Sequence, residues 1–133
     1  MTRLVVDASA VVDLLLRNER GAWVRRQLGT SDLHTPAHLD AEVFSALARL
    51  HRTGVMSADA VEARLRLLAG FELVRHPISD VLLRDAWSIR DNVAARDALY
   101  VVLARRIEAT LLTTDLKLAR AVPTVALAPD RDV

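Results

Sequence analysis

The chain is short enough to form one domain around one hydrophobic core: it has 133 residues, of which 52% are hydrophobic and 26% charged. This balance excludes a disordered chain, and no stretch approaches the roughly 20 apolar residues that a membrane span needs. The absence of cysteine excludes disulfides and thiolate metal sites. We expect a single cytoplasmic domain over residues 1–133, without a signal peptide or a membrane partner.

The formal net charge is only +1, so bulk charge does not predict nucleic-acid binding. The cationic residues are nevertheless unusual, because seventeen are arginines and only Lys117 is a lysine. Guanidinium groups match phosphate oxygens bidentately. Codon bias in a GC-rich genome explains the same excess, so the arginine content alone indicates no function.

Short apolar strands and helices alternate along the first half of the chain. Ala8, Val11 and Leu15 recur at helical spacing after a β-branched run, and Gly29 is a plausible C-terminal cap. The expected elements are a strand at 3–6, helices at 8–17 and 19–28, a strand at 32–36, and helices at 37–52 and 57–68.

The second half continues the alternation. We expect a strand at 71–74, helices at 79–92 and 97–108, a strand at 109–113, a short helix at 115–121 and a strand at 124–128. Strands that alternate with helices form parallel sheets covered on both faces. The fold class predicted is therefore α/β, a three-layer α/β/α sandwich with a parallel central sheet.

Four acidic residues fall where such a sheet binds ligands, beyond the carboxyl ends of its strands. Asp7 follows the first strand, Asp115 follows "LLTT", and Asp97 opens the apolar helix "DALYVVLA". Glu42 lies about 60° from the centre of the apolar stripe of its helix, at the rim of the buried face. Asp40, two residues away, points elsewhere and is a poorer candidate.

Each acid has a structural alternative, since an aspartate at a helix start is commonly an N-cap and a glutamate on a helix is commonly solvated. Four converging carboxylates would repel one another unless a cation neutralised them. Mg²⁺ and Mn²⁺ prefer oxygen ligands, and in proteins they activate water and stabilise charge in phosphodiester chemistry. Convergence of these acids would therefore favour a metal-dependent site.

Other chemistries have weaker support. The glycine-rich loops that cradle phosphates are absent, and the four histidines have no zinc-ligand spacing. We expect His34 and His38 at the surface. No elbow glycines surround Ser9, so it is expected to be a hydroxyl near Asp7, or an ordinary residue in the first turn of its helix, and not a nucleophile.

Four stretches carry a family resemblance: "VVDASAVVDLLL", "HLDAEVFSALARL", "ARDALYVVLAR" and "LLTTDLKLAR", in that order. Together they resemble the PIN domain, and specifically the VapC ribonuclease toxins of bacterial toxin–antitoxin systems. The resemblance runs from Leu4 to Leu127. It implies a metal-dependent endoribonuclease that hydrolyses RNA with Mg²⁺ or Mn²⁺.

Carried over to this chain, the resemblance implies that Asp7, Asp97 and Asp115 hold the metal, with Glu42 binding directly or through water. Ser9 and Thr113 become the supporting hydroxyls of the D-x-S and T-x-D motifs. Relatives with a fifth acid have it at the position of Leu118, so this chain departs from them there.

The resemblance also implies partners. Four arginines lie near the acids in sequence and are candidates for guiding RNA: Arg17, Arg20, Arg49 and Arg96. The alternative for each is an ordinary solvated surface charge. The family usually forms homodimers and is inhibited by a VapB-like antitoxin. The apolar residues of 57–68 (Val61, Leu65, Leu67 and Leu68) predict a dimer or antitoxin groove, or plain core packing.

Two further functions remain open. An acid-pocket phosphotransfer or phosphatase domain also uses an aspartate at a strand end, but the chain has Asp7-Ala8-Ser9 where such a phosphatase needs D-x-D-x-T. A catalytically silent PIN-like module that binds RNA or protein would have lost one of the four acids, and all four are present.

Overall fold

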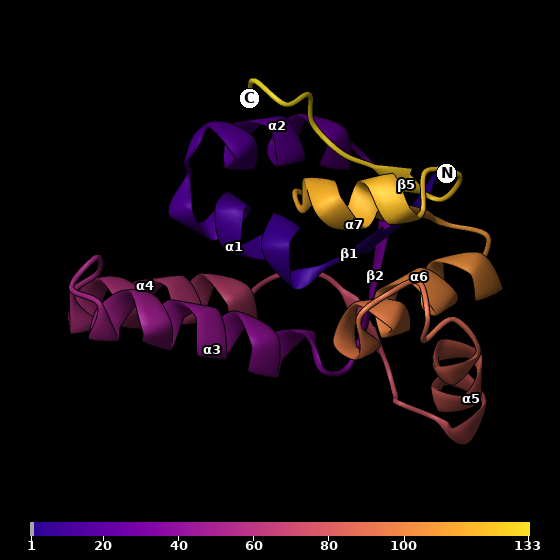
Figure 1. The fold of residues 1–133 in the computed structure, drawn as a ribbon. Helices are drawn as coiled ribbons and strands as arrows, with labels where there is room; N and C mark the ends of the chain where they lie inside the picture. The colour runs from indigo at the N-terminus through magenta and orange to yellow at the C-terminus, as the bar shows by residue number, and fades with distance from the viewer. Residues whose placement is uncertain (1) are drawn as a thin grey trace.

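The computed structural model describes residues 2–133 and has a five-stranded parallel sheet at its centre (Figure 1). The strands are β1 (Arg3–Val6), β2 (Asp32–Pro36), β3 (Val74–His76), β4 (Thr110–Leu112) and β5 (Ala126–Leu127). Their order across the sheet is β3-β2-β1-β4-β5. Both neighbours of β1 are in register with it, since Val5 lies opposite His34 on one side and Leu111 on the other.

Helices connect the strands and cover the sheet. They are α1 (Ala8–Leu16), α2 (Glu19–Leu28), α3 (Leu39–Arg52), α4 (Ala58–Ala69), α5 (Asp80–Ser88), α6 (Ala95–Arg106) and α7 (Leu116–Ala121). α6 packs across β1, β2 and β4, while α1 packs against α2 and α3. In Figure 1, α1 and α6 lie on opposite sides of β1. The predicted α/β/α sandwich with a parallel sheet is confirmed.

The strand order creates a switch point between β1 and β4. The chain first builds outward from β1 to β2 and β3, and then returns to place β4 on the free side of β1. At such a point, the connections after the two adjacent strands diverge and leave a crevice at their carboxyl ends. Asp7 directly follows β1, and Thr113 to Asp115 follow β4, so both lie at this crevice.

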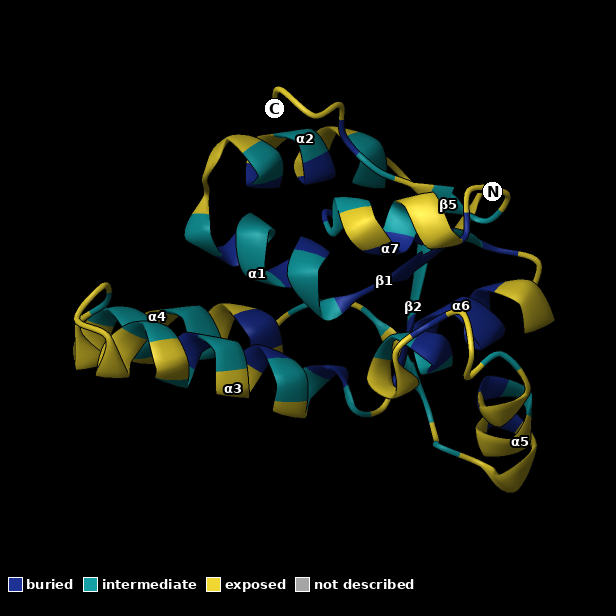
Figure 2. Cartoon of the chain, viewed as in Figure 1, coloured by how far each residue is buried: buried dark blue, intermediate teal, exposed yellow. Residues whose placement is uncertain are grey.

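The core forms where the sheet meets α1, α3 and α6 (Figure 2). α6 contributes most, because six of its twelve residues are buried. Its apolar residues surround the helix instead of forming one stripe, as is typical of a helix buried on several sides. Tyr100 has the largest side chain among the residues that are under 2% exposed, and it carries a polar hydroxyl into this core.

Most element boundaries agree with prediction to within two or three residues, but β3 does not. We predicted a strand at 71–74, whereas β3 is Val74–His76. The prediction was wrong because the apolar residues Phe71 and Leu73 pack against the core from a loop and not from a strand. The strand itself is a polar edge strand, defined by backbone pairing of His34 with Val74. The helix expected at 79–92 also ends early, at Ser88.

Three of the four apolar residues named on α4 lie in the core or pack against it, which agrees with the alternative of plain core packing. Leu68 is buried, and Val61 and Leu65 pack against the core. Leu67 is the exception, since 42% of it is exposed. Within residues 2–133 no helix is both long and apolar enough to cross a membrane.

Candidate active site

Asp7 is held rigidly at the end of β1 and is 3% exposed. Its Oδ1 accepts hydrogen bonds from the Ser9 hydroxyl at 2.7 Å and from the Ala10 amide at 2.9 Å, and its Oδ2 accepts one from the Thr113 hydroxyl at 2.5 Å. The Ala10 bond makes Asp7 the N-cap of α1, as predicted. The Ser9 hydroxyl lies beside Asp7, as expected, and the Thr113 hydroxyl of the T-x-D motif also donates to Asp7.

The loop after β4 is anchored to α1 and α2. Thr114 is 2% exposed, its hydroxyl donates to Asp13 Oδ2 at 2.6 Å, and its carbonyl accepts from Arg20 at 3.1 Å. These bonds orient the next residue, Asp115, which caps α7 by accepting from the Leu118 amide. Asp13 is therefore part of the scaffold of this loop.

Glu42 is oriented by a residue that sequence reasoning missed. The buried Tyr100 hydroxyl donates to Glu42 Oε1 at 2.5 Å, and the ring of His38 lies 4.6 Å from the Tyr100 ring. The Nε2 atom of His38 is 3.5 Å from the same carboxylate oxygen. In the sequence, the feature that could have indicated this role is the position of Tyr100 three residues after Asp97, since residues at this spacing lie on the same face of a helix.

Asp97 is not a helix cap, so the structural alternative considered for this acid does not hold. α6 begins at Ala95 after the N-cap position Ala94, so Asp97 lies in the first turn, where the helix dipole favours a negative charge. Asp40 was expected to point away from the site, and the structure agrees: its carboxylate accepts two hydrogen bonds from Arg75 at 2.7 and 3.0 Å.

All four predicted acids line one cavity of about 360 Å³ at the switch point. Asp7, Glu42, Asp97 and Asp115 are joined there by Ser9, His38 and Tyr100. Of the four arginines predicted to guide RNA, Arg49 and Arg96 line the cavity, whereas Arg17 and Arg20 do not. Arg20 instead binds the carbonyl oxygens of Thr114 and Val133.

The electrostatics of this cavity disfavour ionised carboxylates. Burial raises the pKa of Asp7 to about 6. The hydrogen bonds from Thr113, Ala10 and Ser9 lower this pKa, but the effect of burial is larger. Burial also raises the pKa of Asp97, and the negative charges of Asp115 and Glu42 raise it further. Tyr100 has its pKa raised by burial and by Glu42, so its hydroxyl stays neutral and remains a donor.

The chemistry of the donor set fits a hard divalent cation, because carboxylate oxygens are the ligands that Mg²⁺ and Mn²⁺ prefer. The acidic side chains line the cavity without meeting at one point: among residues 2–133, no three acidic or histidine side chains converge closely enough to hold an ion. Leu118 is buried and adds no fifth oxygen donor.

Two histidines expected at the surface are part of buried contacts. His34 bridges Asp32 at 2.8 Å and His76 at 2.9 Å, so it links β2 to β3. His38 lines the acidic cavity, and its Nδ1 is buried without a hydrogen-bond partner among the described residues. Their positions depend on β2–β3 pairing and on the approach of α3 to α6, neither of which a local pattern reveals.

Comparisons with known proteins agree with this fold and site. The PIN domain family profile matches residues 4–122. Ribonuclease VapC3 of Mycobacterium tuberculosis is 49% identical over 122 residues, covering 91% of this chain and 88% of the relative. Ribonuclease VapC1 of the same organism is 40% identical, covering 91% and 92%. The chain therefore belongs to the PIN-domain family and, within it, to the VapC ribonucleases.

A solved structure shows the same fold at low identity. The VapBC2 structure from Rickettsia felis, bound to a DNA fragment from its promoter, contains a chain that superposes with a TM-score of 0.70. The two are 12% identical, and the match covers 96% of this chain and 98% of that one. The arrangement of strands and helices is thus retained where few side chains are shared.

Proposed function

We propose that this protein is a metal-dependent endoribonuclease toxin of the VapC type, and that the acidic cavity at the β1–β4 switch point hydrolyses RNA phosphodiester bonds. The observation that carries the proposal is that Asp7, Glu42, Asp97 and Asp115 all line one cavity. The four come from four segments of the chain, and capping accounts for only two of them.

PIN-domain VapC ribonucleases depend on divalent metals. In this chain Asp7, Asp97 and Asp115 would hold Mg²⁺ or Mn²⁺, with Glu42 binding directly or through water. The bound ion would supply an activated water and would stabilise negative charge on the phosphate oxygens.

The chain's own residues orient these groups. Ser9 and Thr113 donate to the two oxygens of Asp7 and thereby hold its carboxylate in one orientation. Tyr100 binds one oxygen of Glu42, which leaves the other to face Arg96, whose Nε lies 3.7 Å away. Arg96 and Arg49 are exposed beside the acids, where guanidinium groups can bind the RNA phosphate and orient it for attack.

A VapB-like antitoxin is the proposed protein partner, since VapC ribonucleases pair with such inhibitors. A basic side chain of the antitoxin that reached the four acids would neutralise the cluster and exclude the metal. We further propose a homodimer, supported by Leu83 and Trp87, which are four residues apart on α5 and 51% and 67% exposed. A cytoplasmic location follows from the RNA substrate.

RNA cleavage assays test the proposed activity. Wild-type protein is incubated with total RNA in Mg²⁺, Mn²⁺ or EDTA, beside Asp97→Asn and Glu42→Gln. We expect cleavage with either metal, none with EDTA, and a loss of at least about 100-fold in each variant, because each removes an oxygen ligand. Asp59→Asn and Glu62→Gln make the same chemical changes at exposed sites on α4 and should cleave normally.

The assays also separate the alternatives. RNA that is bound but left intact by the wild type in both metals would indicate a catalytically silent module. Undiminished cleavage in Asp97→Asn would contradict the assignment of the acidic cavity. Release of inorganic phosphate from small phosphoesters, without RNA cleavage, would favour the phosphatase class.

A further inference from the structure

A second cavity, of about 580 Å³, lies beside α1 and α2, and its polar side chains are all arginines. Its lining consists of Leu14, Arg17, Gly21, Ala22, Arg25 and Arg26. No carboxylate lines it, and within residues 2–133 none of the three arginines takes part in an ion pair. Because uncompensated guanidinium groups attract anions, this cavity has the charge of a site for a negatively charged ligand.

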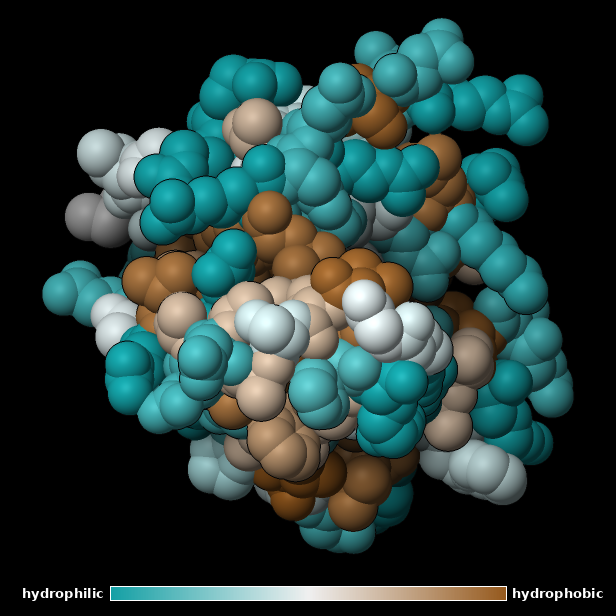
Figure 3. All heavy atoms as spheres, turned by 90° about the vertical axis from the view of Figure 1, so that its left-hand side faces the viewer, coloured by the Kyte–Doolittle hydropathy of each residue, from teal (hydrophilic) through white to brown (hydrophobic). Residues whose placement is uncertain are grey.

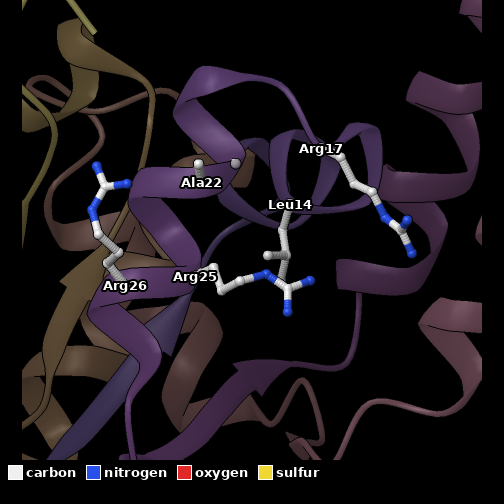
Figure 4. Close-up of a pocket in the computed structure, with 6 residues that line it drawn as sticks. Leu14, Arg17, Ala22, Arg25 and Arg26 are labelled. Atoms are coloured by element: carbon white, nitrogen blue, oxygen red, sulfur yellow. The ribbon is translucent and has the colours of Figure 1, made fainter.

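Figure 4 shows how these side chains lie. Arg17, from the end of α1, and Arg25, from α2, extend beside Leu14, whereas Arg26 points away from both. Arg17 and Arg25 are exposed, so their ten N–H donors are free to bind a ligand. The pair thus offers two guanidinium groups beside the apolar side chain of Leu14.

The backbone holds this pair in place. Gly21 brings α2 so close to α1 that an added Cβ would lie 2.1 Å from the Asp13 carbonyl oxygen. Arg17 ends α1 in the left-handed conformation with φ at 56°, where glycine is the usual residue and another side chain costs about 1 kcal/mol. The Arg17 amide donates to the carbonyl oxygens of Asp13 and Leu14, and this helix termination fixes the backbone from which the Arg17 side chain extends.

The arginine pair lies at the opposite end of α1 from the acidic cavity. α1 runs from Asp7 to Arg17, and ten residues at the helical rise span about 15 Å. α3 packs against α1 and contributes Arg49 to the lining of the acidic cavity. Both helices end toward the face shown in Figure 3, where apolar atoms fill the middle and polar atoms surround them.

We propose that Arg17 and Arg25 bind phosphate groups of the RNA substrate about 15 Å from the bond that the acidic cavity cleaves. The inference rests on the proposed function and extends it by naming a remote substrate contact. Guanidinium groups bind phosphate oxygens bidentately, and repeated phosphates allow one strand to reach both cavities. Leu14 provides an apolar surface for a ribose or base.

RNA binding by an inactive protein tests the inference directly. In an Asp97→Asn background, the affinity for a fluorescent single strand of about 20 nucleotides is measured with and without Arg17→Gln/Arg25→Gln. Loss of two phosphate contacts should reduce the slope of log affinity against log salt by about 1.4, which is roughly a 10- to 30-fold loss at 0.1 M salt. A dinucleotide, too short to reach from the acidic cavity to the arginine pair, should lose much less affinity in the double variant.

Two controls separate a remote site from general effects. Arg105→Gln/Arg120→Gln removes the same charge from exposed positions on α6 and α7 and should leave the affinity within about twofold. Arg17→Gly is compatible with the left-handed backbone, so it should not reduce the free energy of unfolding. Because it removes the guanidinium group, it should still weaken binding of the longer strand.

Unchanged affinity of Arg17→Gln/Arg25→Gln for the longer strand would overturn the inference, even if the wild type cleaves RNA. A loss confined to poly-glutamate, used as an acidic peptide probe, would overturn it in favour of a protein ligand. Failure of the wild type both to bind and to cleave RNA would remove the proposed function as well.

Discussion

At the scale of single residues, Asp7 both caps a helix and faces a charged cavity. The capping bond to Ala10 stabilises α1, whereas burial of the same carboxylate raises its pKa to about 6. An ionised Asp7 therefore costs folding free energy that a neutral group would not. Such a cost is expected at a metal site. A bound cation would compensate the buried negative charge, whereas the metal-free protein is destabilised by it.

Replacement of Asp7 by asparagine should therefore stabilise the metal-free protein and abolish RNA cleavage. Since the folded pKa of about 6 exceeds the ordinary value of 3.8, the cost of ionisation is absent below about pH 4, develops as the pH rises, and is complete above pH 6. About two pKa units correspond to at most about 3 kcal/mol. We expect Asp7→Asn to raise the free energy of unfolding by about 1–3 kcal/mol at pH 7.5.

Urea unfolding in EDTA at pH 7.5 and at pH 4 checks this prediction, since the advantage of the variant should disappear at the lower pH. Asp59→Asn, at an exposed position, should change the free energy of unfolding by less than about 0.5 kcal/mol at either pH. A variant less stable than the wild type at both values would show that the Asp7 charge is not opposed by its surroundings.

At the scale of elements, the close packing of α1 against α2 connects the two cavities. α1 begins at the acidic cavity and ends at the arginine pair, and α2 supplies both Arg20, which holds the Thr114 loop, and Arg25. A small shift of α2 would therefore displace groups at both places. Gly21 is the position that sets the separation of the two helices.

Gly21→Ala should consequently destabilise the protein, because the new Cβ would overlap the backbone of α1 and force the helices apart. We expect a loss of about 2–3 kcal/mol in the free energy of unfolding. Gly70→Ala is the matched control: its Cβ would meet nothing closer than 3.6 Å, so a change below about 0.5 kcal/mol is expected. Equal effects of the two substitutions would show that the α1–α2 contact is not the constraint.

At the scale of the whole molecule, folding energy brings the acids together. The sheet places β1 beside β4, and the packing of α3 and α6 brings Glu42 and Asp97 to the same cavity. Like charges thus approach one another only in the folded state. A cation that binds there must stabilise folding by linkage, since the unfolded chain has no assembled site.

Mg²⁺ or Mn²⁺ should therefore raise the free energy of unfolding by about 2.7 kcal/mol at a concentration of 100 times the dissociation constant. Thermal unfolding followed by calorimetry, with either ion titrated against EDTA, measures this shift. Asp97→Asn should abolish most of it, while Asp59→Asn should show the wild-type shift. An equal shift in both variants would place the bound cation elsewhere on the molecule.

Local sequence patterns account for much of this protein. Apolar periodicity predicts the helices, and the strand-end positions of Asp7 and Asp115 predict two of the acids in the cavity, because caps and strand ends are local features. The prediction placed Glu42 at the rim of the buried face of its helix from the helical angle alone. It placed Asp97 near the site because this residue opens an apolar helix. The edge strand β3 was misplaced because its backbone pairing leaves no hydrophobic signal in its own residues.

The sequence by itself determined the alternation of strands and helices, the parallel sheet and the four candidate acids, since each follows from neighbours along the chain. Only the tertiary structure decided that Tyr100 orients Glu42, that Asp13 and Arg20 hold the Thr114 loop, and that Arg17 faces a different cavity from the acids. Those contacts join residues far apart in the chain or depend on helix direction. Their energies arise when the packed helices and sheet bring the groups together.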